Sequence, residues 1–139
     1  MSVAERVVRE AARQFLEEGV RVMICGRNAE TIEKARAELA KQTGGEVHAV
    51  VADMTKEADI ARLVDTAKQK FGTVDILVNN AGQMYSGRFA AMTDAGLKEQ
   101  FETKIFGFLR AIRLVYPIMK AQKWGRIINI IGGAGKEPD

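Results

Sequence analysis

The feature that most constrains the fold is an alternation of short apolar runs with longer amphipathic stretches. Val20 to Cys25 has the length and composition of a buried strand, and Ala29 to Lys41 repeats its apolar residues with the period of a helix. Further apolar runs at Val47 to Val51, Val74 to Val78 and Arg126 to Ile131 predict three more strands. Strands separated by helices of this length are typical of a parallel sheet covered by helices, so the sequence predicts an α/β fold.

Helix boundaries are marked by capping residues. Besides the helix over Ala29 to Lys41, helices are predicted over Ser2 to Glu18, Lys56 to Lys70 and Thr93 to about Ala121, and residues 79–92 are expected to be irregular. Short polar side chains can accept a hydrogen bond from the first turn of a helix. The expected N-cap residues are Asn28, Thr55 and Thr93.

Composition excludes several classes of protein. The 139 residues are 47% hydrophobic and 28% charged, as in an ordinary globular domain. The 21 Lys and Arg residues are interleaved with 18 Asp and Glu residues, so no basic face for nucleic acid is evident. One Cys and one His exclude a disulfide framework and a His/Cys metal cluster, and no metal is expected. No apolar run approaches the roughly 18 residues of a membrane helix, and no signal-peptide core is found, so we expect a soluble cytoplasmic protein.

The most specific motif follows the third predicted strand. Asn79-Asn80-Ala81-Gly82 places small residues and amides where a ligand can approach the backbone. This motif resembles the hallmark of the short-chain dehydrogenase/reductase family, and three further segments match that family in order and spacing. They are Cys25-Gly26-Arg27-Asn28, Ala52-Asp53-Met54-Thr55 and Trp124 to Ile130. The resemblance, from about Ala12 to Gly135, implies that residues 1–139 form a single partial NAD(P)-binding domain with a Rossmann-like doubly wound parallel sheet.

The same resemblance implies a cofactor site. In the family, an acidic residue just after the second strand holds the adenosine ribose of NAD, but here that position is Gly26, followed by Arg27. A guanidinium binds a 2′-phosphate that a carboxylate would repel, so NADP(H) is expected rather than NAD. A solvent-exposed loop role for Arg27 and a turn role for Asp53 are the alternatives. The cofactor-binding residues that the resemblance implies are Arg27, Asn28, Asp53, Met54, Asn80, Ala81 and Gly82.

The chain departs from the family at its catalytic positions. Lys104 stands where the family has its catalytic Asn, and Gly132 stands where it has its Ser. Tyr116 and Lys120 have the spacing of the family's Tyr-x-x-x-Lys pair, but they precede the last strand, whereas that pair follows it. No Gly-rich phosphate-binding turn precedes the first helix, because Ser2 to Glu10 contain no glycine. We therefore assign no catalytic residue in this chain.

The family's first strand and its C-terminal part are also not found in this sequence. In the family's sheet, the strands lie in the order 3-2-1-4-5, so the first strand is central. The absence of this strand either leaves the edges of two inner strands exposed or forces these strands to pair directly. We expect a mostly parallel four-stranded sheet that is marginal alone or stabilised by oligomerisation. The family uses the helix that corresponds to residues 93–121 for dimerisation, so a homo-oligomer is expected. That helix carries an apolar stripe, which is predicted to lie in the core and at the subunit contact. The stripe consists of Leu97, Phe101, Ile105, Leu109, Ile112, Tyr116 and Met119.

Complete relatives are expected to transfer hydride between NADP(H) and a small carbonyl or alcohol substrate. This chain alone is not expected to catalyse that reaction. The alternatives are a non-catalytic structural or nucleotide-responsive partner subunit, and the product of a gene fragment.

Overall fold

The structure is a computed structural model and describes residues 3–80 and 89–131. Helices and strands alternate along the chain, which confirms the predicted α/β class. The elements in order are α1 (Val3–Glu17), β1 (Val22–Gly26), α2 (Ala29–Thr43), β2 (Val47–Val51), α3 (Glu57–Phe71), β3 (Ile76–Asn79), the 3-10 turn η1 (Phe89–Ala91), α4 (Asp94–Gln100), the π-helical segment η2 (Phe101–Phe106), α5 (Gly107–Gln122) and β4 (Arg126–Asn129).

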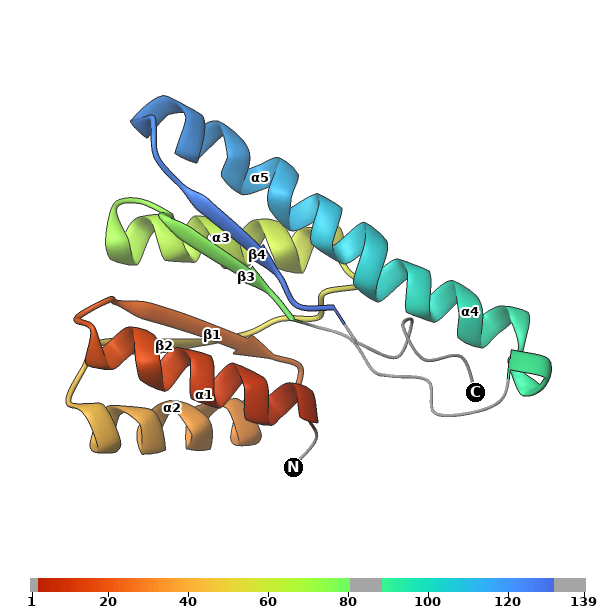
Figure 1. Ribbon diagram of the computed structural model, residues 1–139, viewed down its shortest axis with the longest axis horizontal. Coiled ribbons are helices and arrows are strands. Elements are labelled where there is room, and N and C mark those ends of the chain that lie inside the picture. Colours follow the sequence, from red (N-terminus) through yellow and green to blue (C-terminus); the bar gives the residue numbers. More distant parts are fainter. Residues whose placement is uncertain (1–2, 81–88, 132–139) are drawn as a thin grey trace.

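The four described strands form two parallel pairs. In the first pair Val22 of β1 lies opposite Val47 of β2, and in the second Ile76 of β3 lies opposite Arg126 of β4. Figure 1 shows all four strands running in the same general direction, with α1 and α2 beside the first pair and α3 and α5 beside the second. The carboxyl ends of the strands therefore face one common edge.

The strands do not form the continuous four-stranded sheet that the sequence led us to expect. Within residues 3–80 and 89–131, β1 pairs only with β2, and β3 pairs only with β4. Helix α3 connects the two pairs but packs against α5, which lies on the β3–β4 side. Of the two alternatives, direct pairing is wrong, and no described strand pairs with the inner edge of β1 or of β3.

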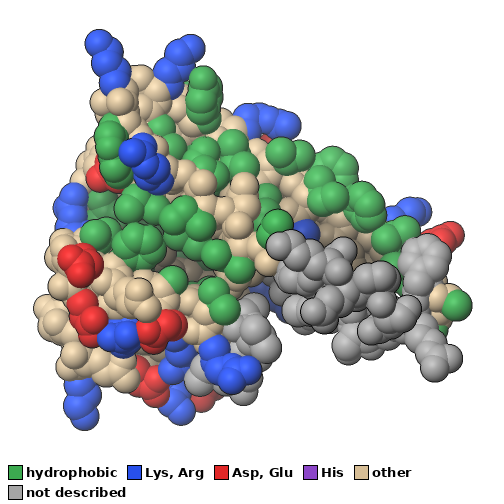
Figure 2. Space-filling model, in the orientation of Figure 1, with side chains coloured by type: hydrophobic (Ala, Val, Ile, Leu, Met, Phe, Trp, Pro, Cys, Tyr) green, Lys and Arg blue, Asp and Glu red, His purple; other side chains and the backbone are tan. Residues whose placement is uncertain are grey.

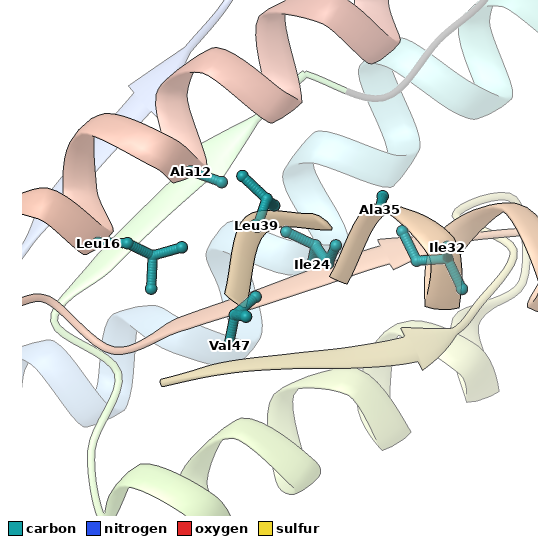
Figure 3. Packing of buried hydrophobic residues seen from close by; sticks show 7 residues of the cluster. All are labelled: Ala12, Leu16, Ile24, Ile32, Ala35, Leu39 and Val47. Carbon is teal, nitrogen blue, oxygen red and sulfur yellow. The ribbon is translucent and has the colours of Figure 1, made fainter. Parts of the chain in front are cut away.

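Each pair of strands has its own apolar core. The cluster beside β1 and β2 draws side chains from α1, α2 and both strands, as Figure 3 shows. Its buried members are Ala12, Leu16, Ile24, Ile32, Ala35, Leu39 and Val47. The cluster beside β3 and β4 is built around Val64 of α3 and Val115 and Met119 of α5. Burial of such side chains is the main favourable term in folding, so each half contributes its own share of stability.

The long helix does not bury the predicted stripe. Helix α5 instead faces α3 with Ala111, Val115 and Met119, whose small or flexible side chains allow close packing. A Cβ at Gly107 would lie 2.9 Å from the carbonyl oxygen of Met54, so only glycine lets the helix approach there. The stripe residues Leu97, Phe101, Ile105, Leu109 and Tyr116 are exposed, Ile112 is half-buried and only Met119 is buried. The core role predicted for the stripe is therefore wrong for most of its members.

Two of the three predicted N-caps are confirmed. The side chain of Asn28 accepts a hydrogen bond from the Thr31 N–H at 3.0 Å, and Thr93 Oγ1 accepts one from the Gly96 N–H at 3.1 Å. Thr55 is not a cap: it lies in the turn before the N-cap position, and its N–H and hydroxyl both donate to Asp53. Helix α3 consequently begins after Lys56, which provides no side-chain cap.

Candidate cofactor site

The candidate site is the edge at which the parallel strands end. In open α/β sheets, ligands bind beyond the carboxyl ends of the strands. Arg27 and Asn28 follow β1, Asp53 and Met54 lie just beyond β2, and Asn80 follows β3. The Ala52 N–H donates to the Gly26 carbonyl at 3.0 Å, which keeps the segments after β1 and β2 together.

Arg27 presents an exposed guanidinium beside β1. Within the part of the chain that the structure describes, its side chain makes no hydrogen bond or ion pair, unlike Arg9, Arg13 and Arg36 on nearby helices. Its positive charge nevertheless reaches Asp53, where it contributes to lowering the pKa of that carboxyl group. Arg27 is thus available to bind an anion at this edge without first breaking an ion pair.

Asp53 organises the turn after β2. Its Oδ1 accepts hydrogen bonds from the Thr55 hydroxyl at 2.7 Å and from the Thr55 N–H at 2.9 Å, while its own N–H donates to Asp59 Oδ2 at 2.8 Å. The hydrogen bonds from Thr55 hold the pKa of Asp53 below its usual value of 3.8, with smaller contributions from the charges of Lys56 and Arg27. The turn role considered for Asp53 is therefore present, and it uses one of the two carboxylate oxygens.

Asp53→Ala is expected to lower the free energy of unfolding by about 1 kcal/mol at neutral pH, because it removes the acceptor of two partly solvent-screened hydrogen bonds. Since folding lowers the pKa of Asp53, its stabilising effect is complete above about pH 4 and is lost as the pH falls through the lowered value. Urea denaturation of both proteins at pH 7 and at pH 2.5 measures this effect. A stability difference that is equally large at both pH values would contradict the ionic origin of the effect.

Asn28 and Met54 have structural roles at the same edge. Asn28 uses its side-chain oxygen to cap α2. The Met54 carbonyl lies against Gly107, the first residue of α5. The edge is therefore fastened both to α2 and to the start of α5.

A pair of asparagines, of which Asn79 is buried and Asn129 is exposed, joins the ends of β3 and β4. Asn79 is 3% exposed, and its Nδ2 donates to Asn129 Oδ1 at 2.9 Å. The parallel register places these two residues directly opposite each other. The amide of Asn79 thus links the two strand ends, and its neighbour Asn80 stands at the edge itself. The sequence did not predict the pairing of Asn79 with Asn129, since Asn79 directly follows one predicted apolar run and Asn129 lies within another.

Several other predicted positions fall elsewhere. Ala81, Gly82 and Gly132 lie outside the described residues. Lys104 lies in the π-helical segment one turn before Gly107, and such segments occur frequently at functional sites. Tyr116 lies within α5 and is 55% exposed.

The remaining chemistry-bearing side chains are structural. Burial raises the pKa of the Cys25 thiol to about 11, which disfavours the nucleophilic thiolate. His48 contacts Glu46 and the ring of Phe71. Residues 3–80 and 89–131 contain no group of three or more His, Cys, Asp or Glu side chains that could hold a metal ion. In the same residues no helix has both the length and the apolar character needed to cross a membrane.

Comparisons with known proteins agree on one family. The family model described as short chain dehydrogenase matches residues 7–139. An uncharacterized oxidoreductase of Bacillus subtilis, YvrD, is 37% identical over 128 residues, which are 92% of this chain and 48% of that protein. The chain therefore spans about half the length of this curated relative.

Solved structures give the same result. A variant of actinorhodin polyketide ketoreductase with NADPH superposes with a TM-score of 0.88 and 32% identity, covering 94% of this chain and 51% of that one. A 7α-hydroxysteroid dehydrogenase complexed with NADH and 7-oxo glycochenodeoxycholic acid gives a TM-score of 0.86 and 33% identity, with 94% and 51% covered. The similarity extends across both pairs of strands and therefore includes the strand-end edge.

Proposed function

The chain belongs to the short chain dehydrogenase family, and we propose that residues 1–139 form the part of an NADP(H)-dependent oxidoreductase domain that holds the adenosine end of the cofactor. The single observation that carries this proposal is the exposed guanidinium of Arg27 at the carboxyl end of β1, which has no ion-pair partner among residues 3–80 and 89–131. The relatives compared above include one bound to NADPH and one bound to NADH, so family membership alone does not select the cofactor.

The residues at the edge fit an adenosine 2′-phosphate. Arg27 would form a charge-assisted pair with the phosphate. The turn uses only Oδ1 of Asp53, and the other carboxylate oxygen would accept a hydrogen bond from the adenine amino group. Asn80, Ala81 and Gly82 would lie beside the central ribose, and Asn28 and Met54 hold the loops that carry Arg27 and Asp53 in place.

The cofactor, when bound, supplies or accepts a hydride, and the proposed substrate class of the complete protein is a small carbonyl compound or alcohol. This chain contributes binding and orientation. The amide hydrogen bond between Asn79 and Asn129 ties the strand ends together, so the ribose-side loop starts from a strand end that is held in place. We assign no proton transfer to a residue of this chain, because Lys104 has no amide carbonyl at the position of the family's Asn.

The presence of Lys104 at the position of the family's catalytic Asn favours a second candidate function. A nucleotide-responsive or structural subunit needs the adenosine site but not the catalytic Asn. Binding of the cofactor without carbonyl reduction would support this second candidate.

Helix α4, segment η2 and helix α5 are proposed to form the contact between two copies of this chain. Leu97, Phe101, Ile105 and Leu109 are between 38% and 47% exposed and recur at helical spacing on one side. A contiguous apolar surface of this kind on a helix is typical of a protein interface. Sedimentation equilibrium of the chain and of Phe101→Glu tests this proposal, since the variant is expected to remain monomeric at concentrations where the unmodified chain associates.

The experiment that tests the cofactor proposal is a fluorescence titration of the purified, folded chain with NADPH and, in parallel, with NADH. We expect saturable binding of NADPH and at least tenfold weaker binding of NADH, since one charge-assisted interaction is lost with the phosphate. Equal affinity for the two cofactors would contradict the role of Arg27, and no binding of either by the folded chain would contradict the proposed function.

A further inference from the structure

Residues 103–136 differ in charge from the rest of the chain. Between Glu102 and Glu137 the sequence contains no Asp or Glu. The basic residues in this stretch are Lys104, Arg110, Arg113, Lys120, Lys123, Arg126 and Lys136. The whole chain has a net charge of only +3, so this stretch carries more positive charge than the chain as a whole. The interleaving of opposite charges seen earlier in the sequence therefore stops here.

The structure brings the end of α5 and the end of α3 together. Gln122, the last residue of α5, donates from Nε2 to the Val74 carbonyl at 3.2 Å and to the Trp124 carbonyl at 2.8 Å. The Arg126 N–H donates to the Asp75 carbonyl at 2.9 Å. These hydrogen bonds hold the last turn of α5, the start of β4 and the segment after α3 at one end of the molecule, where β3 and β4 begin.

Five basic side chains are exposed at this end, which we call the basic end surface. They are Lys68 and Lys70 of α3, Lys120 of α5, Lys123 and Arg126. Within residues 3–80 and 89–131, none of the five makes an ion pair. Figure 2, in the orientation of Figure 1, shows Lys and Arg side chains that project at the upper left, where α5 ends.

The positive charge of the basic end surface is offset only in part. A helix C-terminus carries about half a negative charge, so the ends of α3 and α5 together offset about one cation. Asp75 is exposed between α3 and β3 and offsets another, although its Oδ1 also accepts a hydrogen bond from Gln122. Arg21, just before β1, is balanced by Glu46 at 3.9 Å. A surplus of about three positive charges remains at this end.

An exposed tryptophan stands within the basic end surface. Trp124 is 48% exposed, and the guanidinium carbon of Arg126 lies 4.9 Å from the centre of its ring. Lys123, directly before it, has a φ of 59°. Glycine usually adopts this left-handed conformation at the end of a helix, as Gly44 and Gly72 do after α2 and α3. Helix α5 thus ends with a charged side chain at a position where the backbone favours glycine.

The side chains of the basic end surface fit a layer of anionic lipid headgroups. Tryptophan is enriched at the headgroup level of membranes, where lysine stems lie along the apolar boundary and the ammonium groups stay in water. Clusters of about four to eight Lys and Arg residues attract anionic lipids.

A nucleic acid fits this surface less well. Four of the five cations are lysines, whereas arginine is the side chain that pairs with phosphate through two parallel hydrogen bonds. Proteins that bind single-stranded nucleic acid offer several aromatic rings on which bases stack. Here the one tryptophan of the chain already has Arg126 over its ring.

We propose that the basic end surface binds the surface of a membrane that contains anionic lipids, with Trp124 at the headgroup level. The contact is peripheral, because no helix in the described parts of the chain has the length and apolar character to cross a membrane. The proposal does not depend on the cofactor proposal, since the candidate cofactor site lies at the opposite ends of the strands. It also leaves the proposed contact between copies free, because Leu109 precedes Lys120 by about 16 Å along α5.

Trp124 is the one tryptophan of the chain, so its fluorescence reports contact at this surface. The folded chain is titrated with vesicles of phosphatidylcholine and phosphatidylserine in a ratio of about 3:1, and with vesicles of phosphatidylcholine alone. We expect a saturable blue shift of Trp124 emission with the first vesicles and at least about tenfold weaker binding to the second. Added salt is expected to reverse the shift, because it screens exposed charges.

Two results of this titration would overturn the proposal. The first is the absence of binding to the anionic vesicles by the folded chain. The second is sedimentation of the chain with these vesicles without any change in Trp124 emission, which would place the contact elsewhere on the molecule. Quenching of Trp124 by lipids that are brominated near the start of their acyl chains is expected, since the proposal places the ring at that depth.

A double variant locates the contact. Lys123→Gly combined with Lys120→Gln removes two of the five cations. Each cation near an anionic surface contributes a factor of about five, so we expect about 25-fold weaker binding to the anionic vesicles. The backbone at residue 123 favours glycine, so this variant is expected to stay folded, which circular dichroism checks. Unchanged binding by the folded variant would contradict the proposal.

The matched control removes the same charge elsewhere. Lys34→Gln combined with Lys98→Gln changes exposed positions of α2 and α4, and we expect it to bind vesicles as the unmodified chain does. Equal losses in the two double variants would indicate an effect of net charge alone, and the assigned surface would be wrong. If the variant at Lys120 and Lys123 instead loses binding of a labelled oligothymidylate while its vesicle binding is unchanged, the surface binds nucleic acid and the membrane proposal fails.

Discussion

Arg27→Ala is expected to weaken binding of 2′,5′-ADP by about 30-fold and to leave binding of 5′-AMP unchanged. The two ligands differ only in the 2′-phosphate, so their ratio isolates the contact that Arg27 would make. A hydrogen bond to a charged group contributes about 2 kcal/mol, which corresponds to that factor in affinity. The guanidinium makes no ion pair within the described residues, so little of this gain is offset by a broken interaction. Isothermal titration calorimetry of both ligands measures the ratio directly.

Arg126→Ala is the matched control for this measurement. Arg126 is also exposed, but it stands at the first residue of β4, at the opposite edge from the candidate site, with its guanidinium over the ring of Trp124. Its removal is expected to change the affinity for neither ligand. Equal loss of 2′,5′-ADP affinity in both variants would indicate a general effect of charge, and the site at Arg27 would then be wrong.

Ile60→Ala is expected to have the largest effect on stability, lowering the free energy of unfolding by about 2–5 kcal/mol. Ile60 in α3 is 0% exposed and is one of the two largest fully buried side chains of the described residues. Its truncation removes apolar contacts and leaves a void in a region already beside an open groove, where neighbouring elements can relax only in part. A loss of this size is a large fraction of the stability of an ordinary domain.

Ile131→Ala makes the same chemical change at a position that is 83% exposed. It is expected to alter the free energy of unfolding by less than about 0.5 kcal/mol. Urea denaturation of the unmodified chain and the two variants gives both changes in unfolding free energy, provided that the free energy depends on urea concentration with the same slope in all three proteins. If the two variants lose the same stability, the side chain of Ile60 does not have the packing role described above.

Local sequence signals predicted the elements because those signals act over a few residues. Asn28 and Thr93 cap their helices by accepting a hydrogen bond from the N–H three residues later in the chain, and this local spacing can be recognised in the sequence. The apolar runs became strands for the same reason. The prediction of Thr55 as a cap is wrong because Thr55 lies in the turn before the helix, where its N–H and hydroxyl donate to Asp53, and the N-cap position is Lys56. A short polar residue can serve a turn as well as a helix, and the sequence alone does not decide between them.

Features that depend on which elements meet could not be read from one sequence. The stripe from Leu97 to Met119 has the spacing of a buried face, but α5 packs through Ala111 and Val115, whose small side chains permit closer contact with α3. Pairing of Asn79 with Asn129 required the register of β3 and β4. The groove between β1 and β3 likewise depends on the position at which α3, which follows β2, places the start of β3. Of the candidate site, the sequence indicated the strand-end positions. The structure added the partners of Asp53 and showed that Arg27 makes no ion pair with the residues that it describes.

The measurement that tests the central claim most directly is an NMR titration of the isotope-labelled chain with NADP⁺, with backbone amide shifts followed residue by residue. We expect shifts that saturate together at Gly26 to Asn28, Ala52 to Met54 and Asn80, and none at the amino ends of the strands. A second place at which a cofactor phosphate could bind is the cleft of about 330 Å³ lined by Arg6, Arg9 and Arg13 of α1. Shifts confined to that cleft, or no shifts from the folded chain, would contradict a cofactor site at the strand ends.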